Sequence, residues 1–257
     1  MQLFDTHTHL NSDVYQAKLN EIIEDARSLG VAYMNVVGFD PITNQMAVEI
    51  AKKYPQIYAT AGLHPVDAHT FNEADFIQLE EYVKQDIIVA IGECGMDYYW
   101  HKETKAIQRE VFIRQIELAK KYRKPLIIHV RDAIQDTFDI LKEYQDGTIT
   151  GVMHSFSGSA EMAKRFIEIG FYISLAGPVT FKNAREPKEV AKMVPLDRLL
   201  IETDCPYLTP HPYRGKENKP GHVKLVAETI AEIKGLSIEE IALQTTENAL
   251  KLFQINR

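Results

Sequence analysis

Cysteine and long apolar runs are the most informative features that this chain lacks. Its two cysteines, Cys94 and Cys205, are too few for a disulfide scaffold, which favours a reducing compartment. No run of about 18 apolar residues occurs, and no basic segment followed by an apolar run opens the chain. The sequence therefore predicts neither a membrane span nor a signal peptide, and it predicts a cytoplasmic protein.

Basic residues are also in deficit. Lys and Arg number 29 against 36 Asp and Glu, which gives a formal net charge of -7. Such a surface repels phosphate groups at long range, so any contact with nucleic acid must be local. The 257 residues, 45% hydrophobic and 25% charged, have the composition of a globular protein. No linker or low-complexity tract interrupts them, so we expect a single domain over residues 1–257.

Apolar strands alternate with helix-period segments along the chain. The pattern predicts strands that end at residue 9 and that span 31–37, 57–62, 87–91, 126–130, 149–154, 171–176 and 199–202. Helical patterns lie between them, and further helices fill 222–253, with Ser237 and Glu240 as a capping box. Eight such units predict a (β/α)8 TIM-type barrel with extra C-terminal helices. An open doubly wound sheet is the alternative, but no Gly-x-Gly-x-x-Gly loop follows any strand.

Side chains that bind metals gather where these predicted strands end. In Asp5-Thr6-His7-Thr8-His9 the two histidines are two residues apart, so on a strand both point to the same face. The ends of later strands carry Glu93, His129, His154 and Asp204. Barrel enzymes build their sites at the C-terminal ends of the strands. Any one of these histidines alone would be read as a hydrogen-bonded core residue, but together they predict a metal site.

The number of ligands indicates two divalent ions. Four imidazoles and two carboxylates exceed what one tetrahedral ion requires, and Glu93 is the natural bridge because a carboxylate has two oxygens. Two ions at roughly 3.5–4 Å activate a water and stabilise both oxygens of a phosphodiester that is being cleaved, which predicts hydrolysis. Asp204 is suited both to ligate a metal and to take the proton from that water. Mixed imidazole and carboxylate ligands suit zinc, manganese, iron or, less well, magnesium.

Several motifs together resemble the TatD-type metal-dependent deoxyribonucleases, within the amidohydrolase-like superfamily. They are Asp5-Thr6-His7-Thr8-His9-Leu10, Gly62-Leu63-His64-Pro65, Gly92-Glu93-Cys94-Gly95-Met96-Asp97-Tyr98-Tyr99, Ile128-His129-Val130-Arg131-Asp132-Ala133, His154-Ser155-Phe156-Ser157-Gly158, Glu202-Thr203-Asp204-Cys205-Pro206-Tyr207-Leu208 and Arg214-Gly215-Lys216-Glu217-Asn218. The resemblance extends nearly from end to end of the chain. The sequence departs from the family pattern at Cys94, Met96 and Ser155, none of which is a predicted ligand.

This resemblance implies how the ligands are shared between the two ions. The first metal is expected at His7, His9 and Asp204, and the second at His129 and His154, with Glu93 shared between them. The resemblance also implies that the substrate is DNA, as single strands or strand ends.

Two residues near the predicted ligands have weaker assignments. His64 follows the third strand. It is expected either to contact phosphate or donate a hydrogen bond in the transition state, or to have only a structural role in the loop. Glu202 shares a strand face with Asp204, and a buried carboxylate there is expected to orient a ligand histidine rather than to take part in catalysis.

Loop residues supply candidate substrate contacts. Arg131 and Arg214 are the cations that we favour for phosphate binding, and the remaining loop cations are Lys182, Arg185, Lys216 and Lys219. Tyr98, Tyr99 and Trp100 either stack on unpaired bases or pack on the rim. Cys94 and Cys205 adjoin ligands but point the other way on a strand, so we expect buried, inert thiols.

The sequence thus predicts a metal-dependent deoxyribonuclease that removes residues from strand ends, with no obligate protein partner. The first alternative is an amide or ester hydrolase acting on a small molecule or an aminoacyl-tRNA, because the same ions polarise a carbonyl group. Glu93, rather than the carbamylated lysine of many related two-metal barrels, stands on the fourth strand and favours the nuclease. The second alternative is a non-catalytic barrel with a structural metal site. A structural site needs no spare carboxylate, so the presence of Asp204 argues against this alternative.

Overall fold

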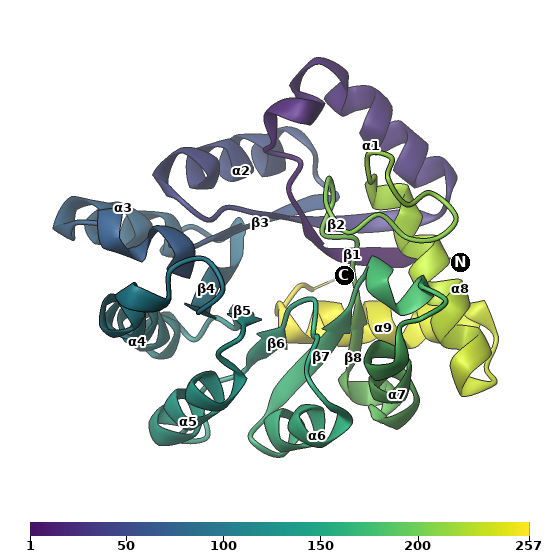
Figure 1. Ribbon diagram of the computed structural model, residues 1–257. Coiled ribbons are helices and arrows are strands. Elements are labelled where there is room, and N and C mark those ends of the chain that lie inside the picture. The colour runs from purple at the N-terminus through teal and green to yellow at the C-terminus, as the bar shows by residue number, and fades with distance from the viewer. Residues whose placement is uncertain (257) are drawn as a thin grey trace.

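The computed structural model describes residues 1–256, and its strands form one parallel sheet in sequence order that curls into a nearly closed barrel (Figure 1). A parallel bridge between Thr8 and Cys205 connects the first strand to the segment after the last one. The barrel prediction is therefore confirmed, and the open sheet is excluded. The strands are β1 (Leu3–Thr8), β2 (Val31–Val37), β3 (Ile57–Ala61), β4 (Ile88–Asp97), β5 (Leu126–Arg131), β6 (Gly151–Met153), β7 (Phe171–Leu175) and β8 (Leu199–Ile201).

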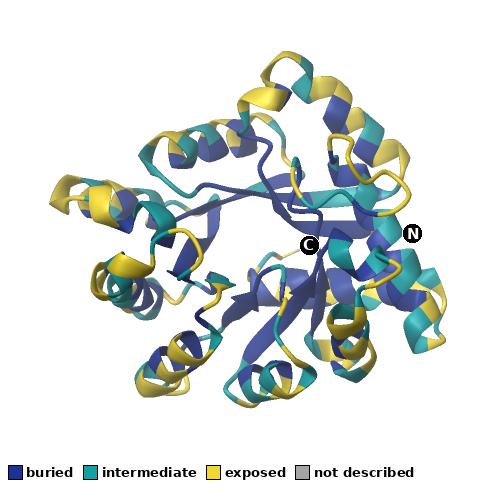
Figure 2. Cartoon of the chain, viewed as in Figure 1, coloured by how far each residue is buried: buried dark blue, intermediate teal, exposed yellow. Residues whose placement is uncertain are grey.

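Helices surround the strands and bury the side that faces the sheet (Figure 2). Their bounds are α1 (Leu19–Ser28), α2 (Pro41–Lys53), α3 (Glu73–Val83), α4 (Lys105–Tyr122), α5 (Ile134–Tyr144), α6 (Ala160–Glu168), α7 (Arg185–Met193), α8 (Val223–Lys234) and α9 (Ile238–Leu252). The capping box at Ser237 and Glu240 starts α9 as predicted. Within residues 1–256, none of these helices combines the length and the apolar character that crossing a membrane requires.

One strand ends far from its predicted end, and the others end within one residue of theirs. β4 continues to Asp97, so Glu93 lies inside this strand rather than at its end. Glycine makes the continuation possible: a Cβ on Gly95 would lie 2.0 Å from the carbonyl oxygen of His129, so only glycine lets β4 approach β5 so closely. β8 ends at Ile201, one residue before its predicted end, and Asp204 lies in the loop that follows, with a positive φ of 57°.

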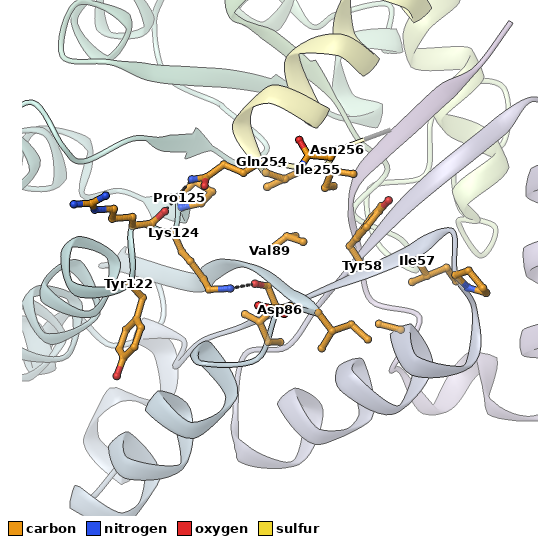
Figure 3. A pocket seen from close by; sticks show the side chains of 16 residues that line it. Ile57, Tyr58, Asp86, Val89, Tyr122, Lys124, Pro125, Gln254, Ile255 and Asn256 are labelled. Carbon is orange, nitrogen blue, oxygen red and sulfur yellow. Dashed lines mark hydrogen bonds between the residues drawn. The ribbon is translucent and has the colours of Figure 1, made fainter.

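Aromatic rings close the N-terminal end of the barrel. The ring of Phe4 lies 5.6 Å from that of Tyr33, 6.0 Å from that of Tyr58 and 5.8 Å from that of Phe253. A cavity of 700 Å³ lies at the same end, between the starts of β3 and β4 and the C-terminal segment (Figure 3). None of the predicted metal ligands lines this cavity. The chemistry is therefore expected at the opposite end, where the strands finish.

Candidate metal centre

β1 brings the two histidines of the opening motif together in the barrel mouth. His7 and His9 are both buried, and their Nε2 atoms lie 3.3 Å apart, as the alternation of strand side chains predicts. Nδ1 of His9 lies 3.1 Å from the carbonyl oxygen of Val37. Because a carbonyl only accepts, this nitrogen carries the proton, and the lone pair on Nε2 faces the centre. Nδ1 of His7 has no hydrogen-bond partner among the described residues.

Glu93 lies between two sets of histidines, the first set being His7 and His9 and the second set His129 and His154. Its Oε2 is 3.4 Å from Nε2 of His7 and 3.8 Å from Nε2 of His9. Its Oε1 is 2.9 Å from Nδ1 of His129 and 3.6 Å from Nε2 of His154. Burial favours the neutral acid, but the charge of His154 and the hydrogen bond from His129 outweigh it and lower the pKa of Glu93 well below its usual range. The side chain is thus an anion with one oxygen directed to each set.

Asp204 completes the first set. Its Oδ1 lies 3.3 Å from Nε2 of His9 and 3.7 Å from Nε2 of His7. Four ligands around a zinc-sized ion lie roughly 3.3 Å apart, as follows from metal–nitrogen bonds of about 2.0 Å in tetrahedral geometry. The ligand atoms of His7, His9 and Asp204 come close to this spacing, and Oε2 of Glu93 lies within 3.8 Å of both histidines, so these residues fit a divalent cation. The left-handed backbone at Asp204 is the kind of strain that functional sites tolerate.

The second set contains a residue that the sequence analysis did not assign. Asp97 is buried at the end of β4, and its Oδ2 lies 2.9 Å from Nε2 of His129. This contact leaves Nδ1 of His129 to face Glu93. Asp97 lies four residues after Glu93, on the same strand face by period two, but the predicted strand stopped at residue 91. The alternation of strand side chains identifies Asp97 only when the strand is extended to residue 97.

Glu202 lies against His154, as expected for a residue that orients a histidine. Nδ1 of His154 is 2.8 Å from Oε1 of Glu202, although the contact lacks good hydrogen-bond alignment. The same oxygen accepts a hydrogen bond of 2.6 Å from the backbone N–H of Ser155. Burial lowers the pKa of His154, but Glu202, Glu93 and Asp204 outweigh it and raise the pKa to about 10. Without a cation, these carboxylates keep a proton on the imidazole, and a bound cation would replace that proton.

His64 faces the same centre as a donor. Its Nδ1 accepts a hydrogen bond of 3.2 Å from the N–H of Val66, so the proton of the neutral ring is on Nε2. That Nε2 lies 3.4 Å from Oε1 of Glu93. His64, Glu93 and His129 are close enough to hold an ion, yet this tautomer favours donation over ligation. Burial and the nearby His129 lower the pKa of His64 and keep the ring neutral.

A cavity of 330 Å³ adjoins the second set of histidines. It is lined by His129, Arg131, His154 and Asp204 on the polar side and by apolar residues that include Phe156, Leu175, Val179 and Leu208 on the other. Arg131 is exposed at the end of β5, so its guanidinium is available at the mouth of this cavity.

The other predicted cations lie in different surroundings. The guanidinium of Arg214 lies 4.1 Å from the ring centre of Phe181, in the loop after β7. Arg185 instead pairs with Glu189 at 3.0 Å, and Nζ of Lys219 lies 3.7 Å from a carboxylate oxygen of Asp25. These two cations are partly neutralised within the chain.

Cys94 and Cys205 are buried free thiols, as expected. Burial raises the pKa of both above the ordinary value, so they stay protonated at neutral pH. Neither belongs to a group of side chains that could hold an ion within the described residues.

Comparison with known proteins gives one family. The family described as TatD related DNase matches residues 4–254. The uncharacterized metal-dependent hydrolase YabD of Bacillus subtilis (strain 168) is 54% identical over 254 residues, covering 99% of this chain and 100% of its own. YcfH of Escherichia coli (strain K12), also called an uncharacterized metal-dependent hydrolase, is 38% identical over 259 residues, with 100% and 97% covered.

Solved structures give the same fold. YJJV, a TatD homolog from Escherichia coli K12, superposes with a TM-score of 0.94 at 27% identity and covers 99% of this chain and 98% of its own. A variant of organophosphorus hydrolase from Deinococcus radiodurans reaches a TM-score of 0.67 at 12% identity, covering 98% and 92%, a likeness of fold alone.

Proposed function

The chain belongs to the TatD-related DNase family, a family of metal-dependent hydrolases, and we propose that it hydrolyses phosphodiester bonds of DNA at strand ends. The observation that carries this proposal is the position of Glu93. One of its carboxylate oxygens faces His7 and His9, and the other faces His129 and His154. A bridging carboxylate between two sets of ligands is what a two-metal phosphodiesterase requires.

The resemblance supplies the proposed ligand sets, and the distances support the first of them, because the ligand atoms of His7, His9 and Asp204 lie within 4.8 Å of one another. His7, His9 and Asp204 would hold the first ion and His129 and His154 the second, with Glu93 shared. When bound there, divalent ions supply Lewis acidity that polarises the phosphoryl group and makes a water more acidic. Zinc, manganese and iron suit these imidazole and carboxylate donors better than magnesium does.

Asp204 is placed to accept a proton from the attacking water. Burial raises its pKa, but His154 and His9 outweigh this effect and keep the pKa below the ordinary value. The carboxylate is therefore ionised and free to accept a proton as the water oxygen bonds to phosphorus and the bond to the leaving oxygen breaks. His64 presents its Nε2–H to the same space, where it would donate to a phosphoryl oxygen in the transition state.

The shape of the site supports action on strand ends. The 330 Å³ cavity beside His129 and His154 is at the lower end of small-ligand sites, which span roughly 300–1,000 Å³. A cavity of this size suits a single nucleotide rather than a continuous duplex. Arg131 at its mouth is positioned to pair with a backbone phosphate.

Metal removal and replacement tests the proposal. The protein is stripped with a chelator, each candidate ion is added back, and cleavage of an end-labelled single-stranded oligonucleotide is compared with hydrolysis of an ester panel and of aminoacyl-tRNA. We expect stepwise shortening of DNA that needs the ion. Cleavage of esters or aminoacyl-tRNA without cleavage of DNA would replace the nuclease with an acyl hydrolase. No turnover of any substrate by the reloaded protein would support a structural site instead.

A further inference from the structure

Two large aromatic side chains are exposed directly after β4. Tyr99 and Trp100 are 54% and 60% exposed, and their rings are perpendicular, with centres 4.9 Å apart. Single exposed apolar side chains are ordinary on a protein surface. Two adjacent ones that share a backbone connection to the candidate metal centre call for a functional explanation.

That connection runs through Asp97. Its Oδ1 accepts hydrogen bonds from the N–H groups of Tyr99 at 2.9 Å and Trp100 at 3.0 Å, while its Oδ2 lies 2.9 Å from Nε2 of His129. Buried Gln108 on α4 binds both the N–H and the carbonyl of Asp97, each at 2.8 Å. The backbone that carries the two rings is therefore held at a fixed position relative to a proposed metal ligand.

A cation lies on the same surface. The guanidinium of Arg131 is 3.7 Å from the ring centre of Tyr99 and 5.6 Å from that of Trp100. Arg131 has no carboxylate partner among residues 1–256, and it lines the cavity that contains His129 and His154. Aromatic faces and an unpaired positive charge thus meet at the edge of the candidate active site.

We infer that Tyr99, Trp100 and Arg131, the stacking shelf, hold an unpaired nucleobase and its phosphate beside the bond to be cleaved. This inference rests on the proposed function and names the substrate form as single-stranded. Aromatic rings bind any base through its π-face, and an arginine guanidinium pairs with phosphate. Bases in a duplex are stacked on both faces, so the shelf discriminates against paired DNA.

The sequence provides a direct probe, because Trp100 is the single tryptophan of the chain. The metal-free protein is titrated with single-stranded oligothymidylate whose phosphorothioate linkages resist hydrolysis. We expect stacking to quench the indole fluorescence, and an abasic strand of equal length to quench it at least about tenfold less at equal concentration. Equal quenching by the two strands, or no quenching by oligothymidylate, would overturn the shelf.

Kinetic measurements on the enzyme with its metal restored distinguish stacking on an aromatic face from simple filling of apolar volume. Trp100→Phe keeps an aromatic face, whereas Trp100→Leu keeps apolar volume without one. We expect KM for single-stranded DNA to be roughly tenfold higher for Trp100→Leu than for Trp100→Phe. Equal KM values would contradict the inference. If the wild-type protein cleaves no phosphodiester, the proposed function fails, and the fluorescence titration still decides whether the shelf binds bases.

Discussion

Oδ2 of Asp97 lies 2.9 Å from Nε2 of His129, so this carboxylate determines which ring nitrogen of His129 faces Glu93. Asp97→Asn keeps the shape but removes the charge that orients and polarises the imidazole. We expect the affinity for the second ion to fall about 10- to 100-fold, the usual cost of losing such a partner. Competition with a metal indicator measures the affinity, and circular dichroism checks the fold. Unchanged affinity would show that Asp97 only anchors the backbone of Tyr99 and Trp100.

Glu93→Gln tests the bridge. The amide of glutamine has one oxygen and no charge, so it cannot bridge two cations. The kcat for DNA should therefore fall by more than the roughly 100-fold that is lost when a residue hydrogen-bonded to a metal ligand is removed. Elemental analysis of the purified variant should also find less bound metal per chain. The matched control is Glu103→Gln, an exposed glutamate that pairs with His101 at 3.0 Å. Full metal content and full activity in Glu93→Gln would rule out the bridging role.

Metal binding should release protons. The pKa of His154 is raised to about 10 in the metal-free protein, so at neutral pH its imidazole holds a proton that a cation must displace. Affinity should therefore fall as the pH falls. Calorimetry in two buffers of different ionisation heat should show release of about one proton from this site near pH 8. Glu202 is the carboxylate that raises the pKa of His154 most, so the Glu202→Gln variant should release fewer protons when it binds the metal. Equal proton release by the variant and the wild-type protein would show that His154 is not the source of the proton.

The sequence predicted best what depends on local periodicity. His7 and His9 converge because strand side chains alternate, and the order of strands and helices alone placed Glu93, His129, His154 and Asp204 in one barrel mouth. These relations need only the strand period and the topology. The position of Asp5 beside the last strand, where it accepts from the N–H of Thr203 at 2.9 Å, follows only from barrel closure.

What escaped prediction depends on neighbours that are distant in the chain. The apolar pattern of β4 stops at Ile91, and Gly95 looks like a strand breaker until β5 is seen to pass so close that only glycine fits. The apolar pattern alone therefore assigns no role to Asp97. The pairing of Arg185 with Glu189 was readable from their spacing of four residues on a helix. The stacking of Arg214 on Phe181 joins two loops that are distant in the chain, so the sequence pattern does not predict it.

This difference between the two arginines leads to a matched test of the basic loops. Arg214 forms no ion pair within the described part of the chain, whereas Arg185 is paired with Glu189. An unpaired guanidinium that neutralises a phosphate releases a counterion, so Arg214→Ala should weaken binding of single-stranded DNA and reduce the slope of log K against log salt by about 0.7. Arg185→Ala should change the slope much less, because Glu189 already offsets its charge. Fluorescence anisotropy over a range of salt concentrations measures both slopes. Equal slopes for Arg214→Ala and the wild-type protein would show that Arg214 does not contact a DNA phosphate.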